Sequence, residues 1–286
     1  MSEQQARGQY ITAVVLYGTI GLALHFIQAP SELVALCRGV IGTAVILLLF
    51  KSKGRSPDRQ ALRKNAGLLL LSGACLGLNW IFLFAAYRVT TVAIASLCNY
   101  MAPIVVVLIA PLVLKDRLNG KKLLCVAAAF VGIVLVSGLP ENGLSGINRK
   151  GLLLGLLAAA CFVGIVLCNK KIVGMDGLEK AAAQLFVSAV TVLPYVILAN
   201  GGIPFPRDAR SLLLIALLGV VHTGIAYIFY FNGMGKLPVQ SLAVLGYLEP
   251  VISVLTSALI LKEPMTPLGG LGAAMIVIAA AASELL

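Results

Sequence analysis

The sequence predicts an all-α polytopic membrane protein whose ten transmembrane helices form two inverted five-helix repeats. Of its 286 residues, 60% are hydrophobic and only 12% are charged. Such a composition is far from that of a soluble globular domain. Ten long apolar stretches give the number of helices, and an internal duplication gives the two repeats.

Each of the ten apolar stretches is long enough, at about 20 residues, to cross a bilayer as a helix. They cover residues 10–27, 31–50, 66–87, 91–114, 122–139, 151–168, 181–199, 211–232, 239–261 and 267–285. The first lacks a convincing small-residue cleavage site and nine more follow, so we interpret it as a span and not as a signal peptide. The longest hydrophilic segment, residues 51–65, is too short to fold alone. The chain is therefore expected to form one transmembrane domain.

The basic residues indicate the orientation of the chain. With the N-terminus inside, the inner segments carry 15 of the 22 Lys and Arg residues, and the outer segments carry six. Excess Lys and Arg favours the cytoplasmic side, so both termini are expected in the cytoplasm, with the chain in a bacterial-type inner membrane. The net charge of +11 is thereby explained without a nucleic-acid partner. The six cysteines lack metal-ligand spacing, so no metal or other cofactor is expected.

The duplication emerges when the sequence is shifted by 147 residues. Residues 81–116 then align with residues 228–263 without a gap, and 11 of 36 positions are identical, among them Pro103 with Pro250. The halves, residues 1–140 and 141–286, hold five spans each, and an odd number means that the second half enters the membrane from the opposite side. Inverted repeats are typical of secondary transporters, whose binding site lies near the midplane where the halves meet.

These features resemble the EamA family of the drug/metabolite transporter superfamily. The resemblance rests on the ten-span duplication, on Arg38 in the second span (LVALCRGVIGT), on Pro103 in the fourth span with LKD at its end, and on YLEP with LKE in the ninth. It covers nearly the whole chain, and the repeated proline with an acidic ending is fairly specific for the family. It implies a transporter but no substrate, because the family includes exporters of amino acids, other metabolites and drugs.

Pro103 and Pro250 predict bends near the middle of spans 4 and 9, because a proline frees the carbonyl four residues earlier. The freed carbonyls belong to Asn99 and Gly246, and in hydrocarbon each needs a partner or a wet cavity. A kink that only improves packing is one interpretation. Its recurrence in both halves favours a hinge or a cavity-lining role.

The repeat alone does not explain Glu249, whose counterpart in the first half is Ala102. A carboxylate inside a span is expected to face a cavity or a partner. Arg38 lies at a similar depth, so an Arg38–Glu249 ion pair is one hypothesis, and both a structural pair and a substrate or proton site remain open. On the helical face of Glu249 lies a second polar candidate, Ser253.

Aromatic and polar side chains share one face in each of spans 3 and 8, as in a pocket for a small, partly apolar solute. Tyr87 is discounted as an interfacial anchor, and a lone His222 is more often packing than a proton shuttle. The predicted substrate-binding residues are Arg38, Asn79, Trp80, Asn99, His222, Tyr227, Tyr230, Glu249 and Ser253, with hinges at Pro103 and Pro250.

The expected function is secondary transport of a small organic metabolite such as an amino acid by alternating access, with protons as one coupling ion. The resemblance to EamA exporters implies an outward direction. No P-loop is present, so the energy for transport must come from an ion or solute gradient. An exporter of organic cations or drugs and a uniporter are the alternatives. Two isolated histidines, without a metalloprotease or a hydrolase motif, argue against an enzyme. The expected partners are the solute and the lipid bilayer, and small-residue patterns leave a monomer and a homodimer open.

Overall fold

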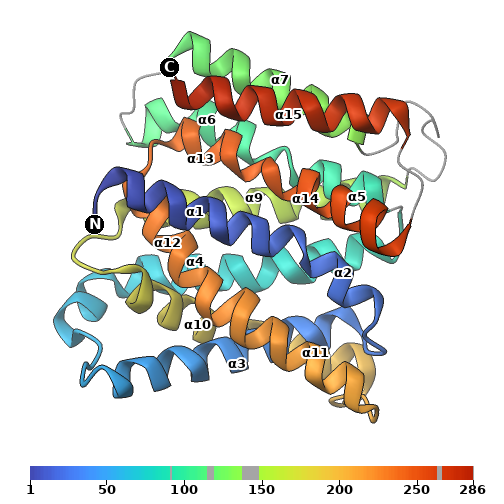
Figure 1. The fold of residues 1–286 in the computed structure, drawn as a ribbon. Coiled ribbons are helices and arrows are strands. Elements are labelled where there is room, and N and C mark those ends of the chain that lie inside the picture. The colour runs from blue at the N-terminus through green and yellow to red at the C-terminus, as the bar shows by residue number, and fades with distance from the viewer. Residues whose placement is uncertain (91, 115–118, 137–147, 263–265, 286) are drawn as a thin grey trace.

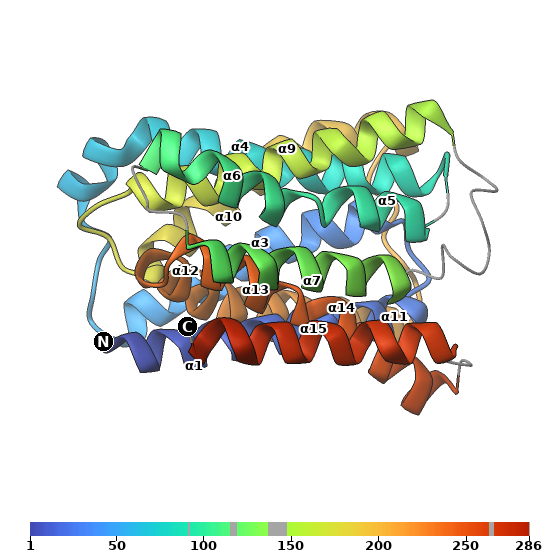
Figure 2. The same cartoon turned by 90° about the horizontal axis from the view of Figure 1, so that it is seen from above.

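The computed structural model describes residues 1–90, 92–114, 119–136, 148–262 and 266–285. All regular elements within these ranges are helices. They lie lengthwise beside one another in a bundle, and the N-terminus and the end of the C-terminal helix lie at the same end (Figure 1, Figure 2). In the described ranges, seven helical segments are long and apolar enough to cross a membrane. The predicted class of polytopic membrane protein agrees with this architecture.

The bounds of the helices in the first half are α1 (Glu3–Gly18), α2 (Ile20–His25), α3 (Ser31–Ser52), α4 (Arg59–Tyr87), α5 (Val92–Asn99), α6 (Ala102–Leu114) and α7 (Gly120–Val136). The second half contains α9 (Arg149–Lys171), α10 (Gly177–Asn200), α11 (Ala209–Gly219), η1 (Val220–Ile225), α12 (Ala226–Lys236), α13 (Val239–Gly246), α14 (Leu248–Thr256), η2 (Ser257–Leu261) and α15 (Pro267–Leu285). The two η elements are π-helical turns.

Seven predicted spans coincide with the segments of sufficient length, which are Ser31–Ser52, Arg59–Tyr87, Ile94–Leu114, Arg149–Lys171, Gly177–Asn200, Ala209–Lys236 and Val239–Leu261. The other three coincide with shorter helices. The first is divided into α1, of 16 residues, and α2. The fifth is α7, of 17 residues, and its predicted end at 137–139 lies outside the described residues. The tenth is α15, whose apolar part is Pro267–Ser283.

Polar side chains cap the helices at both ends of the bundle. Asp58 accepts hydrogen bonds from the first turn of α4, Asn148 from that of α9 and Asp208 from that of α11. Such caps satisfy backbone N–H groups that lack a partner within the helix. These helices therefore begin at polar residues that lie between the apolar stretches.

Two membrane-crossing segments are interrupted just before the repeated prolines. Residues Tyr100 and Met101 separate α5 from α6, and Tyr247 separates α13 from α14. Pro103 and Pro250 then lie in the first turn of the following helix, where the missing N–H of proline has no helical partner to lose. The expected bends are therefore complete breaks of the helix.

Other interruptions in the described residues occur without a proline, and two of them contact each other. Thr19 separates α1 from α2, and the π-helical turn η1 joins α11 to α12. The hydroxyl of Thr19 lies 2.9 Å from Nε2 of His222 in η1, so a hydrogen bond connects the two irregular points. Hydropathy gave no indication of either interruption.

Glycines allow the closest helix contacts. A Cβ atom added to Gly272 of α15 would lie 2.4 Å from the carbonyl oxygen of Gly132 in α7, and one added to Gly132 would lie 2.7 Å from the carbonyl oxygen of Gly272. The backbones of α7 and α15 therefore touch directly. The small-residue patterns predicted in spans 5 and 10 serve a contact within one chain.

Candidate functional site

A cavity of about 400 Å³ lies inside the bundle and is lined by both halves of the chain. Its wall includes residues of α1 to α6, α9 and α12 to α14. The breaks between α1 and α2, α5 and α6, and α13 and α14 all contribute residues beside it, such as Gly18, Tyr100 and Tyr247. This volume is within the range of pockets that hold small organic molecules.

Most of the residues predicted from the sequence meet at this cavity. Eight of the nine predicted substrate-binding residues line it, namely Arg38, Asn79, Trp80, Asn99, Tyr227, Tyr230, Glu249 and Ser253. Pro103 lines it as well. His222 and Pro250 are buried outside the wall. The Nε2 of His222 lies within hydrogen-bond distance of Thr19 and its Nδ1 is buried with no partner among the described residues, so its substrate-binding role stays a prediction.

A cluster of four tyrosines forms one side of the cavity. Tyr10 stacks on Tyr230 with ring centroids 5.1 Å apart, and Tyr17 lies 5.4 Å from Tyr227 and 5.5 Å from Tyr230. Such contacts stabilise the packing of α1 against α12 by about 0.5–1.5 kcal/mol each beyond area burial. The Tyr17 hydroxyl is buried and has no hydrogen-bond partner in the described part of the chain.

Arg38 is held by two contacts on the cavity wall. Its Nε donates to Oγ1 of Thr223 over 3.0 Å, and its guanidinium carbon lies 5.3 Å from the ring centroid of Trp80. The cation–π contact contributes on the order of 1 kcal/mol. The Glu249 carboxylate has no Lys, Arg or His nitrogen of the described residues within 4 Å. The hypothesised Arg38–Glu249 ion pair is therefore not formed as a direct contact, although both residues line one cavity and the charge of Arg38 still acts on Glu249.

The broken helices are joined across the repeat by a tyrosine. The Tyr247 hydroxyl donates to the carbonyl oxygen of Tyr100 over 3.0 Å, which gives the interrupted α5–α6 segment a partner from the α13–α14 break. Asn79 donates to Oδ1 of Asn99 over 3.0 Å and to the Ala158 carbonyl over 2.8 Å. The bond from Tyr247 thus satisfies the Tyr100 carbonyl at the α5–α6 break inside the membrane, whereas Asn79 holds the Asn99 side chain and a carbonyl of α9.

Several cavity residues were not among the predicted ones. Tyr87, which the sequence indicated as an interfacial anchor, lines the cavity, and its hydroxyl lies 3.1 Å from the Ser96 hydroxyl. Tyr247, which was not among the predicted residues, also lines the cavity. Tyr10 and Tyr17 lie in a span that looked like a plain apolar helix. Their seven-residue spacing, which places both on one helical face, was the available signal.

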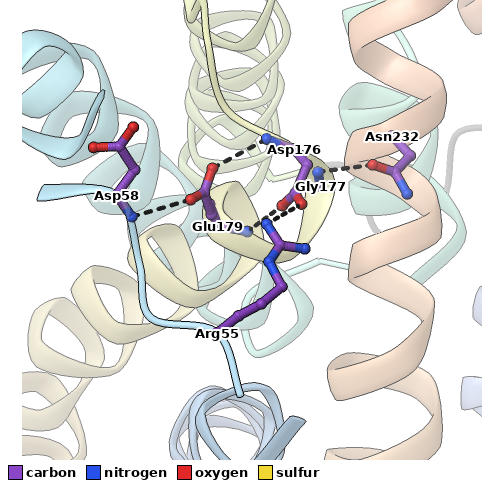
Figure 3. A network of polar contacts seen from close by, with 6 residues as sticks. All are labelled: Arg55, Asp58, Asp176, Gly177, Glu179 and Asn232. Atoms are coloured by element: carbon purple, nitrogen blue, oxygen red, sulfur yellow. Dashed lines mark hydrogen bonds and ion pairs between the residues drawn. The ribbon is translucent and has the colours of Figure 1, made fainter. Parts of the chain in front are cut away.

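One end of the bundle is closed by polar contacts between the α3–α4 loop and α10. Arg55 forms an ion pair of 3.0 Å with Asp176, and Glu179 accepts hydrogen bonds from the backbone nitrogens of Asp58 and Asp176 over 3.1 and 3.2 Å (Figure 3). Glu179 is only 6% exposed. This end also holds both termini (Figure 1).

The same network extends to α12 and α1. Asn232 accepts from the backbone nitrogen of Gly177 over 2.7 Å (Figure 3) and donates to Oε1 of Gln9 over 2.9 Å. A Cβ atom on Gly177 would lie 2.3 Å from Oδ1 of Asn232. Residues from both halves therefore hold this end together.

The opposite end has a contact of its own. Arg88, at the end of α4, pairs with Glu32 at the start of α3, and Asn200 at the end of α10 donates to the same carboxylate over 3.3 Å. The cavity thus lies between two sets of polar contacts that join the halves.

Comparison with known proteins gives a consistent result. The EamA-like transporter family matches residues 9–138 and 149–283. The chain is similar to the uncharacterized transporter YxxF of Bacillus subtilis (22% identity, 85% of this chain and 78% of that protein). Similarity extends to the protein PecM of Dickeya dadantii (28%, 87% and 81%) and to the protein RarD of Streptomyces exfoliatus (28%, 93% and 84%). A crystal structure with 22% identity shares the fold, with a TM-score of 0.87 over 99% of both chains.

Proposed function

The chain belongs to the EamA-like transporter family, and on this premise we propose that it is a secondary-active transporter that exports a small organic solute such as an amino acid by alternating access. Family membership and the names of the relatives indicate a multi-pass membrane transporter and not an enzyme. The observation that carries the proposal is the cavity, in whose wall Arg38 and Glu249 present opposite, unpaired charges beside an aromatic surface.

Ten spans in two inverted repeats are part of the proposal, and two glycine contacts support them. A Cβ atom on Gly73 of α4 would lie 2.6 Å from Cβ of Val187 in α10, and one on Gly219 of α11 would lie 2.6 Å from Cβ of Ile41 in α3. The third span thus contacts the seventh as the eighth contacts the second, which is the correspondence expected of two five-helix repeats. Rocking of one repeat against the other would open the cavity to alternate sides.

The proposed solute is a zwitterion. A carboxylate suits the guanidinium of Arg38, since paired N–H donors match its two oxygens, and an ammonium group suits Glu249. The tyrosines would contact an apolar side chain. An organic cation is the second candidate, because Glu249 and the tyrosine cluster together suit a cation without any carboxylate.

Coupling and orientation complete the proposal. The Glu249 carboxylate has no cationic partner within 4 Å among the described residues, so we propose that it exchanges a proton during the cycle. A uniporter is the alternative. We place both termini in the cytoplasm and the chain in an inner membrane, which the Lys and Arg distribution and the shared end of the termini (Figure 1) support.

Solid-supported membrane electrophysiology on proteoliposomes tests the proposal. Amino acids and organic cations are applied to liposomes with and without the protein, and with and without a pH gradient. We expect currents with amino acids that increase when a proton gradient is imposed. Currents with cations alone favour the second candidate. Uniport of a zwitterion moves no net charge, so uptake of radiolabelled amino acid without a current or a pH response favours a uniporter. The absence of both current and uptake would contradict transport of both solute classes.

Replacing Pro250 with alanine is expected to slow turnover by several-fold and to change the dissociation constant of the solute little. The alanine supplies the N–H that lets α13 and α14 join into one stiffer helix across Tyr247. Turnover is measured by electrophysiology and affinity by solute titration. Pro111, inside α6 and outside the cavity wall, gives the control variant Pro111→Ala. Unchanged turnover in Pro250→Ala would refute the hinge.

Replacing Glu179 with alanine is expected to loosen the end of the bundle shown in Figure 3. The backbone nitrogens of Asp58 and Asp176 would lose their acceptor. Each N–H group that water does not reach would then cost about 1–3 kcal/mol of stability. Backbone hydrogen exchange in residues 55–62 and 173–180 should speed up by about tenfold. Glu3→Ala removes an exposed carboxylate of α1 and serves as the control. Equal exchange in both variants would show that Glu179 does not close this end.

A further inference from the structure

The glycine contacts of the third span show how a regular helix packs in this bundle, and the eighth span differs from them. In α4, Gly73 and Gly77 lie four residues apart, one helical turn. Cβ atoms on them would lie 2.6 Å from Cβ of Val187 and 2.8 Å from Cβ of Thr191 in α10. Two glycines one turn apart therefore contact two residues one turn apart.

The eighth span makes the equivalent contacts with one extra residue. Cβ atoms on Gly219 and Gly224 would lie 2.6 Å from Cβ of Ile41 and 2.9 Å from Cγ1 of Val45 in α3. Ile41 and Val45 are four residues apart, but the two glycines are five apart. The additional residue is accommodated by η1, a π-helical turn at Val220–Ile225. Single π-turns of this kind often occur at functional sites.

The π-turn directs Thr223 toward Arg38. Thr223 is fully buried, at 0% exposure, and its hydroxyl donates to the carbonyl oxygen of Leu218, five residues earlier, over 2.9 Å. A threonine hydroxyl has one hydrogen, so the oxygen faces Arg38 as an acceptor and receives its Nε over 3.0 Å. In a regular helix Leu218 would not be the partner of Thr223, and the hydroxyl would lie in another direction.

The hydrogen bond from Arg38 to Thr223 determines which edge of the guanidinium group faces the cavity. Nε is occupied by Thr223, and the guanidinium carbon lies over the Trp80 ring. The two terminal nitrogens make no hydrogen bond with other residues in the described part of the chain, and Arg38 lines the cavity. Two N–H donors side by side match the two oxygens of a carboxylate.

Resting on the transport function proposed above, we propose that Thr223 on the inserted π-turn is a positioning residue that presents Arg38 as the carboxylate-binding group of the cavity. The cavity therefore selects amino acids over the amines that lack only the carboxylate. His222, the preceding residue, bonds to Thr19 at the break of the first span, so the same turn is anchored both to that break and, through Arg38, to α3.

Binding to the purified full-length protein tests this role without requiring transport. The probes are L-phenylalanine with 2-phenylethylamine, and L-leucine with isopentylamine, each pair differing by a carboxylate. Isothermal titration gives the dissociation constants, and Trp80, the single tryptophan of the chain, gives a second readout by its fluorescence. The wild type should bind each amino acid at least about tenfold more tightly than its amine.

Thr223→Val should weaken amino-acid binding by about tenfold and amine binding by less than about twofold, because only the carboxylate needs the aligned guanidinium. Thr223→Ser, which keeps the hydroxyl, should restore selectivity. Thr43→Val is the control, since the buried Thr43 of α3 donates only to the Gly39 carbonyl and does not line the cavity.

Equal weakening of amino acids and amines, loss of selectivity in Thr43→Val, or no rescue by Thr223→Ser would show a structural role only and would overturn the proposal. A wild type that binds neither amino acid, or binds the amines as tightly, would overturn it as well. Selective binding without substrate currents and without uptake of radiolabelled amino acid in proteoliposomes would leave the role of Thr223 intact and refute the transport function instead.

Discussion

Replacing Glu249 with glutamine is expected to reduce substrate currents by about 10- to 100-fold and to remove their response to a pH gradient. Glutamine keeps the size of the side chain but carries no charge, so an ammonium group of the solute loses a charge-assisted hydrogen bond of about 1.5–3 kcal/mol. No other Asp or Glu of the described residues lines the cavity, so no second carboxylate takes over the role. The same change removes the group that we propose to exchange a proton.

Proteoliposomes with wild-type protein and with Glu249→Gln are compared at equal protein density by solid-supported membrane electrophysiology. Glu3→Gln changes an exposed carboxylate of α1 and should leave the currents unchanged. Aspartate at position 249 retains the charge on a shorter side chain and should recover part of the activity. Currents of wild-type size and pH response in Glu249→Gln would assign Glu249 a structural role and place the substrate site elsewhere.

Replacing Gly272 with valine is expected to destabilise the protein more than any other substitution considered. The new Cβ atom would lie 2.4 Å from the carbonyl oxygen of Gly132 and 2.7 Å from Cβ of Leu135. A backbone oxygen cannot rotate away as a side chain does, so α15 must move off α7. Overpacking costs about 1–3 kcal/mol when side chains adjust, and a contact with backbone should reach the upper part of this range.

The thermal unfolding midpoint in detergent, measured at one scan rate, should decrease by several degrees in Gly272→Val. Gly67→Val is a matched control, because Gly67 lies in α4 with no atom of another residue near the position of its Cβ. It carries the same change in helix propensity without the clash. Equal midpoints for the two variants would mean that α7 and α15 do not pack as closely as their glycines indicate.

Much of the cavity could be predicted from the sequence because polar residues in apolar helices are costly. Arg38 and Glu249 stand out in spans where nearly every neighbour is apolar, and such residues face a cavity or a partner. Spans 3 and 8 showed their aromatic and polar faces by helical periodicity, which located Asn79, Trp80 and Tyr227.

The sequence by itself determined the membrane class, the family, most of the spans and the depth of each candidate residue, because these follow from composition, length and the rise per residue. Only the tertiary structure decided lateral neighbours. It paired Arg38 with Thr223 and not with Glu249, moved His222 out of the cavity wall and brought Tyr17 into it. The reason is that a one-residue π-turn or a break at Thr19 rotates every following side chain, and helix packing, which hydropathy does not encode, sets where that rotation occurs.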